Sequence, residues 1–178
     1  MSDLSETIRQ EEIVRAVHSA AQDVFSTMLN LPLALGDPYE DAKEPESFDG
    51  VVALVGVAGS WTGGGRVSCS PLFACQLASA LLMSPYDAVN EDVLDAVAEV
   101  SNMIIGNVKT FFEEKLGPLG LSVPTVIYGR NYRTRSSGVL KWTVVPFHSG
   151  SEKMDIRICL MPTRNHPVPV MTHELLHG

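Results

Sequence analysis

The sequence lacks the features that mark secreted, membrane and nucleic-acid-binding proteins. It contains only three cysteines, Cys69, Cys75 and Cys159, and no two of them form a C-x-x-C pair. An odd count without such a pair predicts neither a disulfide framework nor a structural zinc site. The longest apolar run, residues 51–58, is far too short to span a bilayer. The first twelve residues are polar and acidic, unlike a secretion or transit signal, so we expect a cytoplasmic protein.

Positive charge is scarce as well. The 178 residues carry 13 Lys and Arg against 21 Asp and Glu, a net charge of −8. This balance argues against nucleic acid and against an anionic membrane surface as partners. The most basic stretch, residues 129–135, is interpreted as an exposed hairpin loop. The length and the 45% hydrophobic content predict one globular domain over residues 1–178.

The chain predicts a helix, two strands, two helices and three strands, in that order. Apolar residues at helical spacing indicate an N-terminal helix within residues 1–30, ended by Leu31-Pro32. A loop with six acidic residues is expected over 36–49, and an irregular tail over 162–178. Strands grouped without strict alternation favour an α+β fold, with an antiparallel or mixed sheet packed against long helices. The other expected elements are strands at 51–59, 66–70, 125–129, 139–147 and 154–161, helices at 71–83 and 91–116, and a glycine-rich turn or bulge at 61–65.

The helix expected over 91–116 has two contrasting faces. With about 100° between successive residues, one stripe is apolar and forms the expected core face. The opposite stripe contains no apolar side chain. Such a stripe is most often a solvated face, but Asn and Gly within a helix each cost up to about 1 kcal/mol relative to alanine. We therefore interpret it as a surface that approaches another molecule closely. The apolar stripe holds Val93, Val97, Val100, Ile104, Val108 and Phe111, and the polar stripe holds Asp95, Glu99, Asn102, Gly106, Lys109 and Glu113.

Asn107 differs from the residues of the polar stripe. It lies at the edge of the apolar stripe, close to Val100 and Ile104 on the helical wheel. A buried amide needs hydrogen-bond partners. We therefore expect a structural role for Asn107, tying the helix to a neighbouring strand or loop.

The polar stripe carries a recognisable pattern. Asp95-x3-Glu99-x2-Asn102, followed after 21 residues by Pro124, resembles the signature of the CheC/CheX/FliY group of bacterial chemotaxis phosphatases. The run from Glu99 to Lys109 is most similar to the CheX branch, and so is the single copy of the signature. The spacing to Pro124, which we expect to be structural, is one residue shorter than the family pattern. The order of elements after the first helix also resembles that fold.

This resemblance implies hydrolysis of the phospho-aspartate of a CheY-like response regulator. Asn102 would position the attacking water and Glu99 would anchor the receiver domain, while Gly106 and Lys109 would contact the partner. Asp95 would be either a peripheral partner contact or a partner of the helix dipole. Mg²⁺ would belong to the partner's receiver domain, so no cofactor is expected in this chain. A homodimer is expected because CheX-type proteins pair through sheet edges. The alternative is a non-catalytic, CheC-like module that binds a response regulator or another signalling protein.

A competing motif lies at the C-terminus. His173-Glu174-Leu175-Leu176-His177 matches the zinc-protease pattern H-E-x-x-H letter for letter. That chemistry needs a helix held in the protein interior, so that both imidazoles reach one ion. Here the motif follows two prolines in the expected irregular tail. We therefore expect no catalytic zinc site.

Overall fold

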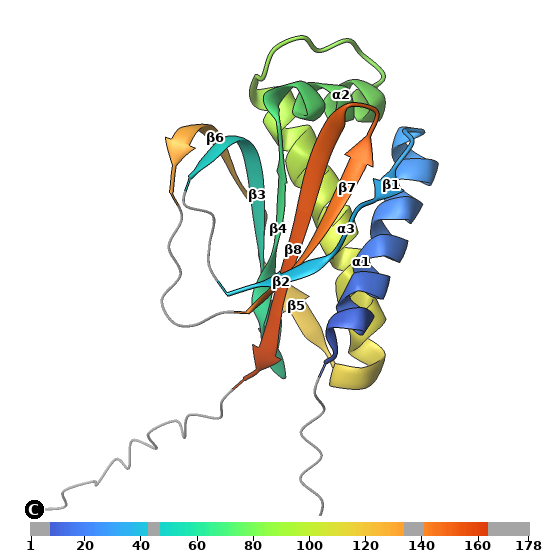
Figure 1. Cartoon of the computed structure of the whole chain (residues 1–178), viewed down its shortest axis with the longest axis vertical. Helices are drawn as coiled ribbons and strands as arrows, with labels where there is room; N and C mark the ends of the chain where they lie inside the picture. The colour runs from blue at the N-terminus through green and yellow to red at the C-terminus, as the bar shows by residue number, and fades with distance from the viewer. Residues whose placement is uncertain (1–7, 43–46, 134–140, 164–178) are drawn as a thin grey trace, which may run out of the picture.

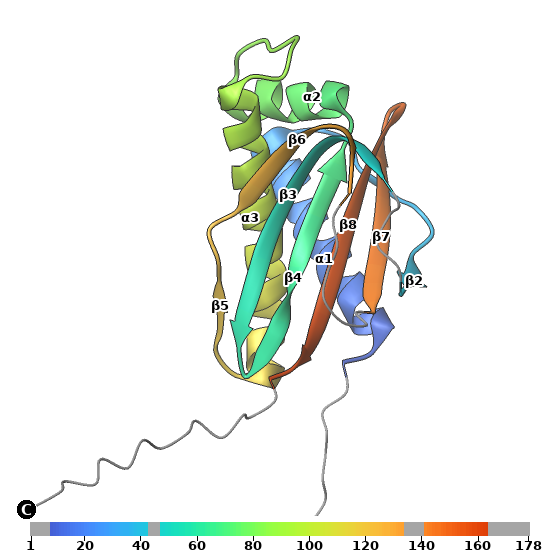
Figure 2. The ribbon, with the colours of Figure 1, turned by 90° about the vertical axis from the view of Figure 1, so that its left-hand side faces the viewer.

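The computed structural model describes residues 8–42, 47–133 and 141–163. Its strands form one eight-stranded sheet in which every pairing is antiparallel. Helices α1 and α3 run side by side along one face of this sheet, and α2 crosses the end of the molecule (Figure 1, Figure 2). The strand order is β1-β7-β8-β4-β3-β5, with β2 also paired to β7 and β6 also paired to β3. The predicted α+β fold is confirmed.

Helices α2 and α3 begin where the sequence places their N-terminal caps. Helix α3, Glu91–Leu116, starts after Asn90, whose side chain accepts a 3.0 Å hydrogen bond from the Val93 amide, and stops at Gly117. Helix α2, Pro71–Leu82, is capped in the same way by Ser70. The first helix consists of α1, Gln10–Val24, and a π-helix η1, Phe25–Leu29, closed by Asn30 in the left-handed conformation.

The turn or bulge predicted over 61–65 is wrong. These residues belong to strand β4, Trp61–Cys69, which pairs with β3, Phe48–Gly59, and with β8, Glu152–Pro162. The glycines permit close approach of neighbouring groups. A Cβ on Gly63 would lie 1.9 Å from the Cys159 carbonyl oxygen, and a Cβ on Gly65 would lie 2.4 Å from Cδ1 of Ile105 in α3. The absence of side chains at these glycines therefore lets β4 approach β8 and lets α3 pack closely against β4.

The acidic loop predicted over 36–49 is partly wrong. It contains strand β2, Tyr39–Asp41, which pairs with β7, Trp142–Ser149, and is followed by β3 from Phe48. Glu40 forms an ion pair with Lys141 at 2.6 Å, and Asp41 forms one with Arg157 at 3.4 Å. Two of the acids thus fasten a short edge strand, whose three residues are too few to show a strand pattern in the sequence. Residues 43–46 lie outside the described part.

The basic stretch is also more regular than predicted. Strand β6, Thr125–Tyr132, pairs with β3 as far as Tyr132, so residues 129–132 are strand rather than hairpin loop. Two elements too short to predict are β1, Ala34–Leu35, and β5, Leu119–Leu121. The rest of the basic stretch beyond Arg133 and the tail from residue 164, with its H-E-x-x-H motif, lie outside the described residues.

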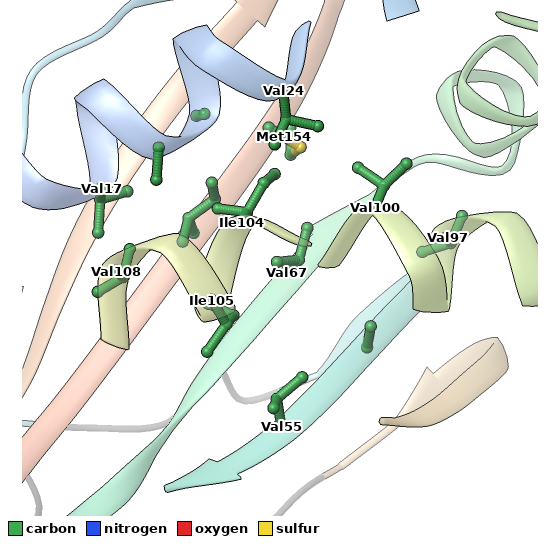
Figure 3. Packing of buried hydrophobic residues seen from close by; sticks show 14 of the residues in the cluster. Val17, Val24, Val55, Val67, Val97, Val100, Ile104, Ile105, Val108 and Met154 are labelled. Carbon is green, nitrogen blue, oxygen red and sulfur yellow. The ribbon is translucent and has the colours of Figure 1, made fainter. Parts of the chain in front are cut away.

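Helix α3 packs against α1, α2 and the sheet, and its apolar stripe contributes to the centre of the core. Figure 3 shows Ile105 directed toward the sheet beside Val55 and Val67, while Ile104 is directed toward α1. Phe111, predicted to be buried, is 45% exposed, and Phe112 is buried in its place. The helical wheel placed Phe111 on the buried face, but α1 leaves a groove open over the C-terminal half of α3 and Phe111 is exposed there. None of the described helices is both long enough and apolar enough to span a bilayer.

The contact between Gly65 and Ile105 makes a specific prediction for stability. Gly65→Ala forces the Ile105 side chain to move, so we expect a loss of about 1–2 kcal/mol in the free energy of unfolding. In an Ile105→Ala background the obstructing atoms are gone, and the same substitution should cost close to nothing. Urea unfolding of the four proteins measures this coupling.

Gly120→Ala is the matched control for this cycle. Its Cβ would lie 3.6 Å from the Ala58 carbonyl oxygen, an ordinary contact, so its stability should stay near wild type. Equal losses for Gly65→Ala in both backgrounds would contradict the packing account.

Candidate functional site on helix α3

The polar stripe lies on one accessible face of α3, as predicted. Asp95 and Glu99 are exposed, while Asn102, Gly106 and Lys109 are half-buried. In the described part of the chain, the side chains of Asp95, Glu99 and Asn102 take part in no hydrogen bond or ion pair. Their carboxylate and amide groups are therefore available to a partner molecule.

The C-terminal end of the stripe is fastened to the sheet. The Lys109 ammonium lies 2.9 Å from the Glu113 carboxylate, which also accepts a 3.0 Å hydrogen bond from the backbone amide of Leu119 in β5. The Leu119 amide and then Lys109 lower the pKa of the Glu113 carboxyl below its ordinary value of 4.5. Lys109 is thus already paired with Glu113 within the chain. The contact with a partner that was expected for Lys109 would be made in addition to this ion pair.

The connection from β5 to β6 runs along the same face. A Cβ on Gly106 would lie 3.9 Å from Cδ1 of Leu121, so the helix and β5 meet here without crowding. Ser122 then holds the connection to β3, because its Oγ accepts a 2.8 Å hydrogen bond from the Gly56 amide. Half-buried Pro124 comes immediately before β6. Pro124 thus lies in a connection that Ser122 holds to β3, and its fixed φ angle further limits the conformations of this connection.

The structure does not support the burial expected for Asn107. Its side chain is exposed and lines a groove of about 550 Å³ between α1 and α3, together with Ala16, Ala20 and Phe111. Asn107 is exposed for the same reason as Phe111: small alanines on α1 leave this part of α3 uncovered. Asn107 therefore does not tie the helix to a neighbouring strand.

The two main hollows in the described part of the chain lie away from the polar face. Neither this groove nor a second hollow of about 410 Å³ beside α1 is lined by Glu99 or Asn102. Small ligands bind mainly in concave, mostly apolar sites, whereas this pair stands on the exposed side of a helix. Among the described residues, no group of three or more His, Cys, Asp or Glu side chains is placed to hold a metal ion. The geometry suits insertion into a cleft of another macromolecule.

Comparison with known proteins agrees with this geometry. A family model described as "Chemotaxis phosphatase CheX" matches residues 51–148, more than half of the chain. The chain belongs to the CheX family. The matched region includes Asp95, Glu99 and Asn102, and it extends from β3 into β7.

Individual relatives cover most of the chain. CheY-P phosphatase CheX of Thermotoga maritima is 26% identical over 129 residues, which cover 72% of this chain and 83% of the relative. The crystal structure of a chemotaxis protein CheX from Desulfovibrio desulfuricans has a TM-score of 0.74 at 27% identity, covering 84% of this chain and 99% of that one. The CheX–CheY–BeF3–Mg²⁺ complex from Borrelia burgdorferi has a TM-score of 0.71 at 26% identity, covering 83% of this chain and 97% of the matched one.

Two features around helix α3 were not predicted from the sequence. Glu113 was placed on the polar stripe, but its bond to the Leu119 amide depends on β5, which is too short to predict. The groove beside Asn107 was also missed, although the small residues Ala16, Ser19 and Ala20 on α1 were a visible signal for it.

The Glu113 carboxylate predicts an acid-dependent loss of stability. A carboxyl whose pKa is lower in the folded state contributes stability above its unfolded pKa, and that contribution is lost as the pH falls through the folded value. We expect Glu113→Gln to lower the melting temperature at pH 7 and to approach wild type below the ordinary pKa of 4.5. Thermal melts across this range test it, with exposed Glu114→Gln as the control, which should differ little from wild type at any pH. A Glu113→Gln deficit that persists in acid would contradict the ionic account.

Proposed function

We propose that this chain removes the phosphoryl group from the phospho-aspartate of a CheY-like response regulator. Water attacks phosphorus, the bond between phosphorus and the aspartyl oxygen breaks, and the products are inorganic phosphate and a free aspartate. The observation that carries the proposal is the pairing of Glu99 and Asn102, both without partners in the described chain, on one exposed face of a CheX-family helix. A relative named as a CheY-P phosphatase and a similar structure in complex with CheY support the reaction and the partner class.

Asn102 is proposed to orient the attacking water. An acyl phosphate is already reactive, so catalysis consists mainly of placing water in line with the leaving oxygen. The Asn102 carbonyl oxygen accepts a hydrogen from that water, while its NH₂ group donates to a neighbouring oxygen. An amide is neutral and does not repel the phosphoryl group, as a carboxylate at this position would. Because Asn102 stands on a long helix, its position is fixed before the partner arrives.

Glu99 is proposed to anchor the partner. It precedes Asn102 by three residues, so the two side chains lie on neighbouring parts of the same helical face. An ion pair between the Glu99 carboxylate and a lysine of the receiver would fix the register of the helix in the cleft. Asp95, one turn earlier and also exposed, adds negative charge at the entrance to this face. Gly106, one turn after Asn102, has no side chain that would hold the partner away from the helix.

Mg²⁺ is assigned to the partner's receiver domain, so this chain supplies side chains and no cofactor. The reaction is placed in the cytoplasm. A homodimer through a sheet edge is proposed, and β6 offers such an edge because, among the described residues, it pairs only with β3.

Phosphate release from a phosphorylated CheY-like receiver tests the roles of the pair. Asn102→Ala should lower kcat by about 10²-fold or more, while the Kd for a beryllofluoride-activated receiver stays near wild type. Isosteric Asn102→Asp should also fail, because it places a negative charge beside the phosphoryl group. Glu99→Ala should raise that Kd by about 10-fold or more.

Asn107→Ala is the matched control, since it removes the same amide from the same helix outside the polar face. It should leave both kcat and Kd unchanged. If wild type binds phosphorylated receivers without accelerating phosphate release from any of them, the hydrolytic proposal is overturned and the alternative, a non-catalytic binding module, takes its place.

A further inference from the structure

The groove between α1 and α3 contains an aromatic side chain that the described chain leaves uncovered. Phe111 lines this groove and is 45% exposed, with its ring edge-on to that of buried Phe112 at 5.1 Å between centroids. Ala16 and Ala20 line the same groove from α1. An accessible aromatic ring beside small apolar residues in a hollow is typical of a site that apolar side chains fill. The groove is therefore suited to hold a peptide segment.

The rim of the groove is acidic. The carboxylate of Glu12 is paired with the Lys115 ammonium at 3.1 Å. Asp23 and Glu114 line the groove as well, and among the described residues neither of them forms an ion pair. Exposed charges of this kind contribute little to stability, but they orient an occupant that carries positive charge or hydrogen-bond donors.

The last described residue lies at the end of α3 where the groove begins. Thr163 donates a 3.0 Å hydrogen bond from its backbone amide to the Ser60 carbonyl oxygen. The Ser60 hydroxyl in turn donates to the carbonyl oxygen of Leu116, the last residue of α3. Lys115, the neighbour of Leu116, lines the groove. Residues 164–178 therefore start beside the C-terminal end of α3, where β8 also ends (Figure 2).

We propose that residues 170–177 of this chain occupy the groove between α1 and α3. Phe111 lies about 7.5 Å along the helix axis from Leu116, and a helix is about 10 Å across, so a path of about 20 Å joins Thr163 to the groove. Residues 164–169 include two prolines, which favour extended backbone, and six extended residues span about 20 Å. Residues 170–177 are therefore the first part of the tail that can lie along the groove.

The composition of this segment matches the groove. Its apolar side chains can cover Phe111 and the alanines of α1, and the N–H groups of its imidazoles can donate to the carboxylates of the rim. Its only acid is Glu174. The H-E-L-L-H letters at 173–177 thus belong to an internal docking segment and not to a metal site. The apolar residues of the segment are Val170, Met171, Leu175 and Leu176, and its imidazoles are those of His173 and His177.

The docked segment and the polar face occupy different sides of α3. Phe111 follows Asn102 by nine residues, which places it about 180° around the helix axis. Docking in the groove therefore neither needs nor blocks the proposed reaction.

Disulfide trapping in the full chain tests where the tail lies. Ser19 lines the groove, whereas exposed Arg15 lines the hollow on the other side of α1 and is one turn nearer to the end where the tail begins. Under a mild oxidant, Ser19→Cys combined with Leu176→Cys should form an intramolecular disulfide about tenfold faster than Arg15→Cys combined with Leu176→Cys. Cys69, Cys75 and Cys159 are buried and stay out of the reaction.

Thermal melts of full-chain variants give a second, independent readout. Phe111→Ala and the double variant Leu175→Ser/Leu176→Ser should each lower the melting temperature by about 2–4 °C, and their combination should lower it by less than the sum, because each removes one side of the same contact. Leu72→Ala is the control. Leu72 is 58% exposed on α2 at the other end of the molecule, so its effect should add fully to that of the tail variant (Figure 1).

Faster trapping at Ser19 together with non-additive melts supports the proposal. Equal trapping rates at Ser19 and Arg15 would overturn it, and so would a disulfide that forms mainly between two chains, since the occupant would then be a second copy. Neither readout uses phosphate release, so a failure of the proposed function leaves the docking of the tail standing.

Discussion

The close approach of Ile105 to the backbone of Gly65 determines where helix α3 lies, and the functional face depends on that placement. No side chain fits between them, since a Cβ on Gly65 would lie 2.4 Å from Cδ1 of Ile105. On an ideal helix Glu99 lies about 120° around the axis from Ile105, and Asn102 about 60°. Seating Ile105 on the strand therefore turns Glu99 toward solvent and leaves Asn102 at the border with β5 and β6.

The remaining contacts fix this helix without using the groups proposed for chemistry. Glu113 bridges Lys109 and the Leu119 amide at one end, and Tyr86 binds Asp92 at the other. Between these two fastenings, the side chains of Glu99 and Asn102 remain unengaged in the described chain. A rigid helix that presents one anionic and one neutral polar group is well suited to enter a receiver's cleft, because little conformational freedom remains to be lost on binding.

The sequence predicted the elements that local signals define and missed those that depend on distant partners. Helix α3 was placed correctly because Asn90 and Gly117 mark its ends and because its polar stripe has helical spacing. The glycines at 63–65 indicated a turn, since nothing local shows that Cys159 and Ile105 will pack against them. Asn107 and Phe111 were expected to be buried because a helical wheel gives only the direction of each side chain around the helix axis. Whether a side chain is buried depends on which neighbouring element covers that side of the helix. The phosphatase signature was found by resemblance, and its geometry became visible only in the fold.

The most direct test of the account is a crystal structure of this chain bound to a receiver whose aspartate carries beryllofluoride in place of the phosphoryl group. The account predicts that α3 enters the receiver's cleft, that Glu99 pairs with a receiver lysine, and that the Asn102 amide holds a water in line with the bond between beryllium and the aspartyl oxygen. A complex in which Asn102 lies outside hydrogen-bonding distance of any such water, or in which another face of the protein binds the receiver, would contradict it.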